Sequence, residues 1–328
     1  MPRAWHLKSR PSGLPTADNF ELKPIHLPPL EDGMVRVANR WLSVDPYMRG
    51  RMNDVKSYVP PFAIDAPMEG GAVGEVVESS APGLQPGDLV VHMAGWRDEA
   101  VLPSAAANKI PDLGVEPQAF LGNVGLTGGT AYFGLLDAAS AKEGDIVFVS
   151  AAAGAVGSAV VQIAKASNMT VIGSARGADK CEFVRSLGAD AVIDYTAGPL
   201  VKSLAEAAPD GIDVYFDNVG GDHLDAALAH ARRNARFAIC GMIDVYNSGQ
   251  PASLRYITRI IGMRIRLQGF IYTDYLPRMG EFYGDMGGWI ASGQVKSRDT
   301  VVEGLERMPE AFLGLFEGAN TGKMLVKL

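Results

Sequence analysis

The period of the hydrophobic pattern changes along the chain. Up to about residue 121, apolar residues form short and often alternating runs, for example at 34–39, 73–78 and 88–92, and turns rich in proline and glycine separate these runs. Alternation at every second position is typical of strands with one buried face. Residues 1–121 are therefore predicted to form a β-rich, partly open barrel.

Between residues 122 and 293, short buried runs alternate with segments of helical spacing. β-branched and aromatic runs predict strands at 146–149, 170–173, 191–193, 213–216, 237–240 and 264–267. Strands that alternate with helices predict an α/β domain with a doubly wound parallel sheet. A helix over 302–316 and a last apolar run over 324–328 follow, and residues 294–328 are expected to return to the first domain.

The segment 143–158 predicts a strand, a tight turn and a helix in direct succession. Ala152, Gly154 and Gly157 stand at the spacing of the G-x-G-x-x-G turn, with alanine in the first place. The middle glycine lets the backbone approach a pyrophosphate, and the free N–H groups at the helix start attract that anion. By spacing alone, a tight turn without a ligand is an equal alternative. The second strand at 170–173, at the distance of a βαβ unit, favours a dinucleotide site.

The residues after this second strand distinguish NAD from NADP. An acidic residue here accepts the ribose hydroxyls of NAD, whereas the 2′-phosphate of NADP requires a nearby cation. Arg176 follows Ser174 at the strand end and Lys180 comes one turn later, with no carboxylate at the critical position. Asp179 is expected to begin the next helix. Solvated surface charges are the alternative for both cations, but after a dinucleotide turn the pattern favours NADP.

Length, charge and cysteine content narrow the class of protein. A chain of 328 residues suggests two domains, and 47% hydrophobic with 20% charged residues is typical of a globular protein with a sizeable core. The net charge of −7 argues against nucleic acid or an anionic membrane as the main partner. The two cysteines form no C-x-x-C pair, residues 1–8 lack the apolar core of a signal peptide, and no membrane span is evident. A reducing, cytoplasmic setting is expected.

Five motifs in sequence order resemble one known family, and the resemblance covers nearly the whole chain. They lie at 43–52, 129–135, 151–157, 216–221 and 320–323. Together they are similar to the zinc-independent medium-chain dehydrogenases/reductases. Within these they resemble the branch of leukotriene B4 12-hydroxydehydrogenase / prostaglandin reductase, with plant alkenal double-bond reductases and bacterial curcumin reductases.

This resemblance implies a fold, a cofactor and a reaction. The fold is a GroES-like catalytic domain over 1–121 with 294–328, and a Rossmann NADP-binding domain over 122–293. NADPH is the implied cofactor and a homodimer the implied assembly. The implied reaction is hydride transfer to the carbon–carbon double bond of α,β-unsaturated ketones or aldehydes without a metal. In agreement, no cysteine precedes Cys181, and residues 67–71 read Pro-Met-Glu-Gly-Gly where the wider family has Gly-His-Glu.

The resemblance also implies the cofactor contacts. Thr130 matches the position that meets the nicotinamide amide, while Lys180 and Tyr195 match residues around the 2′-phosphate. For Cys240 and Phe270, at strand ends, apolar packing is an equal alternative. The full set of expected contacts is Thr130, Gly154, Ala155, Val156, Gly157, Ser174, Arg176, Lys180, Tyr195, Asn218, Cys240, Gly241, Met242, Ile243, Tyr246, Phe270, Ile271, Tyr272 and Asn320.

Two tyrosines are the expected catalytic residues. Tyr47 and Tyr58 match active-site tyrosines of the branch, and we expect Tyr58 to donate a hydrogen bond or proton to the substrate and Tyr47 to form a pocket wall. The loop from Tyr246 to Tyr256 is expected to contribute further pocket walls. Mammalian and plant relatives carry another catalytic tyrosine where this chain has Gly262. Either Tyr256 or a ribose hydroxyl of the bound cofactor is expected to take its place.

Two other functions stay open at this point. A quinone reductase of the zeta-crystallin type would share the fold and the cofactor, and release of semiquinone during turnover would distinguish it. A non-catalytic NADPH-binding protein would bind the cofactor tightly and consume none with enones or quinones.

Overall fold

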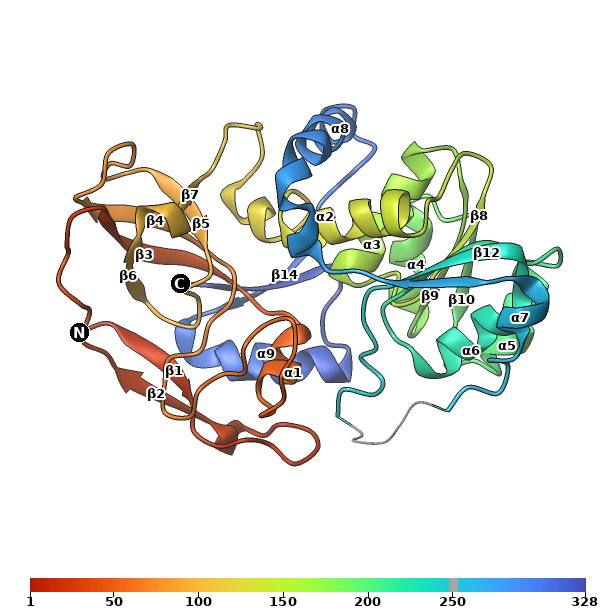
Figure 1. Ribbon diagram of the computed structural model, residues 1–328, viewed down its shortest axis with the longest axis horizontal. Helices are drawn as coiled ribbons and strands as arrows, with labels where there is room; N and C mark the ends of the chain where they lie inside the picture. Colours follow the sequence, from red (N-terminus) through yellow and green to blue (C-terminus); the bar gives the residue numbers. More distant parts are fainter. Residues whose placement is uncertain (248–252) are drawn as a thin grey trace. The chain divides into compact units, whose positions relative to one another are not determined.

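The computed structural model describes residues 1–247 and 253–328, which form two compact units (Figure 1). Unit 1 comprises Met1–Leu121 and Asp299–Leu328, and unit 2 comprises Gly122–Arg298. The C-terminal segment therefore belongs with the first part of the chain. Within the described ranges, no helix has both the length and the apolar character that a bilayer crossing requires.

Unit 1 is rich in strands, as its alternating pattern predicts. Its elements are β1 (Arg3–Leu7), β2 (Phe20–Pro24), β3 (Met34–Ser43), α1 (Tyr47–Arg51), β4 (Ala72–Ser79), β5 (Leu89–His92), β6 (Glu99–Pro103), β7 (Asn108–Lys109), β14 (Asp299–Glu303), α9 (Met308–Glu317) and β15 (Lys323–Lys327). A seven-stranded sheet follows the order β14-β15-β3-β4-β5-β7, and β6 pairs with β3 off this path. β1 and β2 form a separate antiparallel pair.

The C-terminal segment corrects one prediction. It begins at Asp299 rather than at residue 294, and its first element is a strand, so the helix predicted over 302–316 is wrong at its start. β14 runs parallel to β15, with Val302 opposite Val326. The β-branched run before residue 303 suits a strand, and Gly304 at φ +94° ends it, so the helix α9 begins only at Met308.

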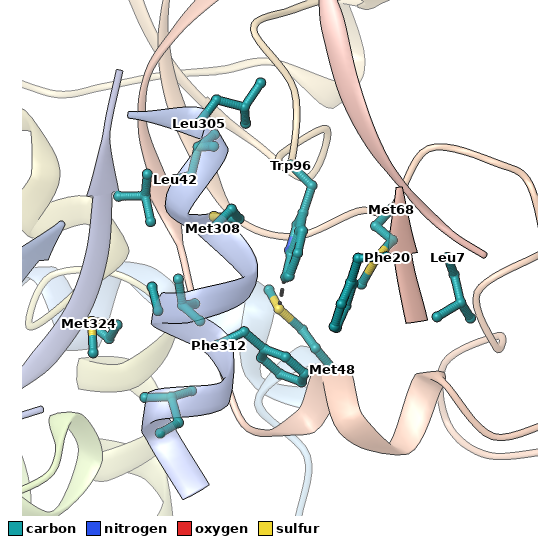
Figure 2. Close-up of a cluster of buried hydrophobic side chains, with 14 of the residues drawn as sticks. Leu7, Phe20, Leu42, Met48, Met68, Trp96, Leu305, Met308, Phe312 and Met324 are labelled. Atoms are coloured by element: carbon teal, nitrogen blue, oxygen red, sulfur yellow. Dashed lines mark hydrogen bonds between the residues drawn. The ribbon is translucent and has the colours of Figure 1, made fainter. Parts of the chain in front are cut away.

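The core of unit 1 surrounds Trp96 and holds helix α1 (Figure 2). The Trp96 ring lies 5.8 Å from the Phe20 ring in a stacked arrangement and 5.8 Å from the Phe312 ring edge-on. Its indole Nε1 donates to Sδ of Met48 at 3.4 Å, and Met48 is fully buried. Because close-packed cores resist displacement, Met48 fixes the helix on which its neighbour Tyr47 stands.

Unit 2 is the α/β unit that the alternating strands and helices predict. Its elements are α2 (Leu126–Phe133), β8 (Ile146–Val149), α3 (Ala155–Ala166), β9 (Thr170–Ala175), α4 (Ala178–Ser186), β10 (Ala191–Asp194), α5 (Leu200–Ala207), β11 (Ile212–Asp217), α6 (Gly221–His230), β12 (Ala231–Ile239), α7 (Arg259–Met263), β13 (Arg266–Gly269) and α8 (Met279–Ala291). The sheet order is β10-β9-β8-β11-β12-β13, and every pairing is parallel. Helices α2 and α3 pack together on one face and α5 and α6 on the other (Figure 1), which confirms the doubly wound prediction.

Aromatic side chains on neighbouring strands join the centre of this sheet. Tyr215 of β11 stands opposite Phe148 of β8 and Phe237 of β12. Its ring lies 5.2 Å from the first and 5.3 Å from the second, and all three side chains are fully buried. Aromatic rings bury a large apolar area, so their packing stabilises the positions of β8, β11 and β12 in the sheet.

Candidate active site

The turn between β8 and α3 has the geometry of an anion-binding turn. Gly154 caps α3 in an extended conformation, and its N–H donates to the Ala151 carbonyl at 2.9 Å. A Cβ atom on Gly157 would lie 2.2 Å from the same carbonyl oxygen, so the helix can approach the turn only at a glycine. Ala155 and Val156 open the helix, and its first turn holds no acidic residue. The free N–H groups and the helix dipole therefore favour an anion here.

This turn lies where the sheet reverses its winding. β8 and β11 are neighbours, yet the chain continues from β8 towards β10 and from β11 towards β13 on opposite sides. Asn218, directly after β11, donates through Nδ2 to the Ser150 carbonyl at 2.8 Å and through its N–H to Ser150 Oγ at 2.9 Å. Open α/β sheets bind ligands outside the carboxyl ends of their strands at such a reversal. These two bonds join the strand ends that border that position.

Asp217 shapes the second of these strand ends. Its carboxyl is fully buried, and Oδ1 accepts a bond from the Tyr215 hydroxyl at 2.7 Å. The same oxygen accepts the N–H groups of Val219 at 2.9 Å and Gly220 at 2.7 Å, so it folds the turn after β11. Burial raises the pKa of this carboxyl. The motif at 216–221 does not distinguish Asp217 as a functional residue, because a sequence pattern does not reveal that its carboxyl is buried.

Two cations follow β9 beside the turn. Ser174 is buried in β9, Arg176 after it is exposed, and Lys180 is partly buried on α4. Burial lowers the pKa of the Lys180 ammonium, and the nearby charge of Arg176 lowers it further. The two cations therefore lie within reach of each other, and an anion beside them would offset their repulsion. Asp179 stands in the first turn of α4, as predicted.

An aromatic pair borders these cations. Burial raises the pKa of the Tyr195 phenol, and the Arg176 charge lowers it, which places the two groups near each other. The ring of His223 on α6 meets the Tyr195 ring edge-on, with 5.0 Å between their centres. Burial lowers the pKa of His223 to about 4, so its imidazole is neutral at physiological pH. His223 could not be identified from the sequence, because its ring on α6 meets the Tyr195 ring, directly after β10, only in the folded protein.

The segment after β12 returns to Asp217. The N–H groups of Cys240 and Gly241 donate to the Asp217 carbonyl at 2.9 and 3.0 Å. Burial raises the pKa of the Cys240 thiol to about 12, so this group is a protonated, small apolar side chain at neutral pH. Packing thus accounts for Cys240 itself, while the backbone of its segment lies at the sheet reversal.

The next residues of this segment form a closed turn. The N–H of Met242 donates to the Tyr246 hydroxyl at 3.2 Å, with Ile243 between them. The Tyr246 hydroxyl is thereby held against the start of its own turn. Of the expected pocket loop from Tyr246 to Tyr256, residues 248–252 lie outside the part of the chain that the structure describes.

Residues 270–272 pack against α2 through two glycines. A Cβ atom on Gly129 would lie 2.4 Å from the Tyr272 ring, and one on Gly134 would lie 2.3 Å from the Phe270 ring. Ile271 between them is partly buried. The aromatic side chains therefore occupy space that only glycine leaves open, which gives Phe270 and Tyr272 a packing role.

Two further expected cofactor contacts make local hydrogen bonds. The Thr130 hydroxyl donates to the Leu126 carbonyl one turn earlier in α2, at 2.7 Å. Asn320 in unit 1 donates through Nδ2 to the Gly322 carbonyl at 2.8 Å. Both bonds fix the direction of the side chain and leave its oxygen as an acceptor.

The expected catalytic tyrosines differ in exposure. The Tyr47 hydroxyl, on α1, is buried and has no hydrogen-bond partner among residues 1–247 and 253–328. Burial raises the pKa of this phenol, and the charge of Asp45 raises it further, so the group is a protonated donor. Tyr58 stands in the segment after α1, with 62% of its surface exposed. Both residues belong to unit 1.

A buried ion pair at the start of α1 is another feature that sequence analysis missed. Lys323, 3% exposed, donates from Nζ to Asp45 Oδ1 at 2.9 Å and to the Val44 carbonyl at 2.8 Å. The Ser43 hydroxyl donates to the other oxygen of Asp45. The ion pair joins β15 to the start of α1. The sequence around Lys323 does not indicate that its partner is an aspartate 278 residues away.

The position that lacks the family tyrosine, Gly262, lies near its expected substitute Tyr256 in sequence. Gly262 stands in α7, where an added Cβ would meet nothing within 4 Å. Tyr256 is 37% exposed, and its N–H donates to Asp225 Oδ1 at 2.9 Å. The guanidinium of Arg255 lies 6.0 Å from the centre of the Tyr256 ring. Neither of these contacts, with Asp225 and with Arg255, places Tyr256 at the strand ends that border the turn between β8 and α3.

These residues fit a phosphorylated dinucleotide. The glycine turn admits a close approach of an anionic group to the main chain, and a pyrophosphate is such a group. Two cations lie near each other after β9 at the place where a ribose phosphate requires them. The donors at this end of the sheet are thus suited to NADP.

Two family models and several known proteins match this chain in sequence. A family model described as the N-terminal domain of oxidoreductase matches residues 3–110, and one described as zinc-binding dehydrogenase matches residues 155–287. The NADPH-dependent curcumin reductase of Escherichia coli is 40% identical over 99% of this chain and 96% of its own length. The 2-alkenal reductase (NADP(+)-dependent) of Nicotiana tabacum is 39% identical over 98% of this chain and 95% of its own length.

A solved structure agrees with these relatives. The crystal structure of CurA from Vibrio vulnificus in complex with NADPH shares 42% identity and a TM-score of 0.94, over 99% of this chain and 98% of that chain. This chain belongs to the zinc-independent medium-chain dehydrogenase/reductase family. The resemblance carried by the five motifs is confirmed.

One family model's description raises the question of a metal site in this medium-chain reductase. In the described ranges, no three His, Cys, Asp or Glu side chains come close enough together to hold one ion. Glu69, at the position where the wider family has Gly-His-Glu, instead accepts a bond from Arg51 at 2.7 Å. Cys181 is buried and far in sequence from that segment. The donor set of a zinc dehydrogenase is therefore not assembled by these residues.

Proposed function

We propose that this medium-chain reductase uses NADPH to reduce the carbon–carbon double bond of α,β-unsaturated ketones and aldehydes. The observation that carries the proposal is the pair of cations Arg176 and Lys180 after β9, beside the anion-binding turn of α3. Support for the substrate class comes from relatives named as a curcumin reductase and a 2-alkenal reductase, which match nearly the whole chain.

The chain's own groups bind and orient the cofactor. N–H groups at the start of α3 hold the pyrophosphate, and Arg176 and Lys180 hold the 2′-phosphate beside Tyr195. Thr130 offers its oxygen to the nicotinamide amide, and Asn320 is a further proposed cofactor contact. When bound, NADPH supplies the hydride that adds to the β-carbon of the substrate.

Tyr58 is the proposed partner of the substrate carbonyl. As the β-carbon is reduced, negative charge develops on the carbonyl oxygen, and a phenol donates a hydrogen bond to that oxygen while staying protonated near neutral pH. Removing one such donor typically costs ~100-fold in turnover. The exposed Tyr58 can meet a substrate from solvent. At the position of the further family tyrosine this chain has Gly262, which supplies no phenol.

Tyr47 forms a wall of the same pocket. Its buried hydroxyl has no partner in the described part of the chain. Such a group costs about 1–3 kcal/mol until it is satisfied, so a bound substrate oxygen or water that accepts its hydrogen bond is favoured.

The proposed assembly is a homodimer formed along the edge of the unit 2 sheet. β13 ends the strand order, so among the described residues only β12 pairs with it. Ile261 on the preceding helix α7 is 82% exposed. An open strand edge next to an exposed apolar side chain favours pairing with a second copy.

NADPH absorbance tests the proposed function. The purified protein is incubated with NADPH and with alkenals, cyclic enones, curcumin-like dienones or quinones, and products are identified by mass. We expect enones and enals to consume NADPH and to gain two hydrogens at the double bond, and NADH to be a poorer donor. Consumption with quinones alone, with release of semiquinone, would instead assign a quinone reductase. Tight NADPH binding without consumption by any compound would exclude an enzyme of either kind.

A further inference from the structure

One residue, Arg51, holds the far end of the segment that carries Tyr58 through its side chain and its backbone carbonyl. Arg51 is the last residue of α1, and 7% of its side chain is exposed. Its Nε donates to the Pro60 carbonyl at 2.9 Å, and its own carbonyl accepts the N–H of Phe62 at 2.7 Å. The guanidinium therefore ties residues 52–62 back onto the helix from which they leave.

The guanidinium is itself fixed by its surroundings. Its Nη2 donates to Glu69 Oε2 at 2.7 Å, and its central carbon lies 4.1 Å from the centre of the Phe62 ring. Phe62 is 3% exposed and belongs to the core around Trp96. Because a guanidinium is planar, a ring on its face and two acceptors at its edge define its orientation completely.

This orientation is passed to Tyr58 through a short, stiff connection. Pro60 and Pro61 follow Tyr58 closely, and each proline ring fixes the backbone angle φ. Tyr58 is largely exposed, so packing of its own ring supplies only part of its restraint. The bond from Arg51 to the Pro60 carbonyl therefore restrains the backbone two residues from the phenol.

The polar groups of this region gather at α1. Burial raises the pKa of the Tyr47 phenol, and the Asp45 charge raises it further. Arg51, Tyr58 and Glu69 also act on this pKa, which places all three near the Tyr47 hydroxyl. The clamp formed by Arg51 is thus part of the region that holds both proposed active-site tyrosines.

We propose that Arg51 is a positioning residue, whose guanidinium holds the segment 52–62 so that the Tyr58 phenol stands where the substrate carbonyl oxygen binds. This inference rests on the proposed function, because Arg51 acts only through Tyr58. The guanidinium is occupied by the Pro60 carbonyl, Glu69 and the Phe62 ring, and these contacts are all within unit 1. Its effect is therefore on geometry, and a displacement of about 1 Å can lower a rate ~100-fold.

Arg51→Met tests the clamp. Methionine keeps apolar packing on Phe62 and removes both side-chain bonds. We expect turnover to fall ~10-fold to ~100-fold while NADPH affinity, measured by fluorescence, stays within about twofold, because Arg51 is not one of the proposed cofactor contacts. Hydrogen exchange of the amides at 53–59 is expected to accelerate. Glu69→Gln keeps an oxygen for Nη2 and is expected to change turnover less than about threefold.

Arg36→Met is the matched control. Arg36 of β3 pairs with Glu99 of β6 at 2.6 Å in the same unit, as Arg51 pairs with Glu69. Its loss removes an ion pair of similar geometry and leaves 53–61 untouched. We expect unchanged turnover and unchanged exchange in that segment. If Arg51→Met fails to fold, Arg51→Lys replaces it, because an ammonium keeps the charge but lacks the planar fork that reaches both acceptors.

A double-mutant cycle with Tyr58→Phe separates the inference from the proposed function. If Arg51 acts through the Tyr58 hydroxyl, Arg51→Met lowers turnover in the native background but changes it less than about twofold in the Tyr58→Phe background. Equal losses in both backgrounds, or full turnover in a folded Arg51→Met protein, overturn the inference alone. Unchanged turnover in Tyr58→Phe itself overturns the role of Tyr58 in the proposed function, and with it the role of Arg51.

Discussion

Single buried polar groups in this protein divide into those with partners and those without. Lys323 satisfies its charge with hydrogen bonds inside the chain, whereas only Oδ1 of Asp217 accepts such bonds and its Oδ2 has no partner among the described residues. The Tyr47 hydroxyl is buried without a partner in the described ranges. A native fold retains such a group where a ligand satisfies it, since the unsatisfied hydroxyl costs about 1–3 kcal/mol.

Two buried histidines couple the stability of the fold to pH. Burial lowers the pKa of His92 to about 4, and it lowers the pKa of His223 to about 4 as well. In the unfolded chain a histidine titrates near 6.5. Below that pH the unfolded state binds a proton at each histidine that the folded state does not bind, so the free energy of unfolding falls as the pH falls from 6.5 towards 4.

We therefore expect each of these histidines to lower the free energy of unfolding by about 2 kcal/mol between pH 7 and pH 5. Urea unfolding at both pH values measures the loss. His92→Asn supplies an acceptor in place of Nδ1, which receives the Ala94 N–H at 3.1 Å, and it removes the titration. The variant should lose less stability on acidification than the native chain. An equal loss in both proteins would show that His92 does not contribute.

At the scale of elements, the start of α3 combines two constraints in one turn. Gly154 lets the backbone come close to an anion, while Gly157 lets the helix come close to the strand end. Only the second is a steric requirement of the fold itself, because a Cβ on Gly154 would lie 3.2 Å from the Ala151 carbonyl and one on Gly157 would lie 2.2 Å from it. The two glycines are thus expected to respond differently to the same substitution.

Gly157→Ala should force the turn to move and should weaken NADPH binding ~10-fold or more, since the start of α3 provides the anion site. A titration of NADPH fluorescence measures the affinity, and thermal unfolding reports the strain in the free protein. Gly284→Ala in α8 is the control, because its Cβ would meet nothing within 4 Å and alanine favours a helix. Native affinity in Gly157→Ala would contradict the assignment of this turn as the pyrophosphate site.

At the scale of the whole molecule, each unit has a core of its own. Unit 1 packs around Trp96, and unit 2 packs aromatic rings between the strands of its sheet. The chain enters unit 2 after Leu121 and leaves it before Asp299. Unit 2 contains a complete parallel sheet, and β13 is the last strand in its order.

Ile261→Asp should weaken the proposed homodimer, because it places a charge on the exposed apolar side chain next to β13. Light scattering after size-exclusion chromatography is expected to give twice the mass of one chain for the native protein and a shift towards one chain for the variant. Val77→Asp, at an exposed apolar position on β4 of unit 1, is expected to keep the native mass. A native protein with the mass of one chain would contradict the proposed assembly.

The amino-acid sequence by itself determined the periodic and local features of this protein. Alternating runs predicted the β-rich first unit, and the run 146–149 with its glycine turn predicted β8 and the start of α3. Arg176 and Lys180 were found because the residues after a second strand have a known task in dinucleotide sites. The helix expected over 302–316 failed at its start, because a short β-branched run becomes a strand only when a neighbour such as β15 pairs with it.

Only the tertiary structure decided which distant side chains meet. Asp45 accepts a hydrogen bond from Lys323, and the His223 ring contacts the Tyr195 ring edge-on. Glu69 accepts a bond from Arg51, whose guanidinium lies over the Phe62 ring. A sequence records the period of burial along one element but not the partner across elements, because that partner depends on strand order and helix packing. The residues that shape and hold the candidate site came from those contacts.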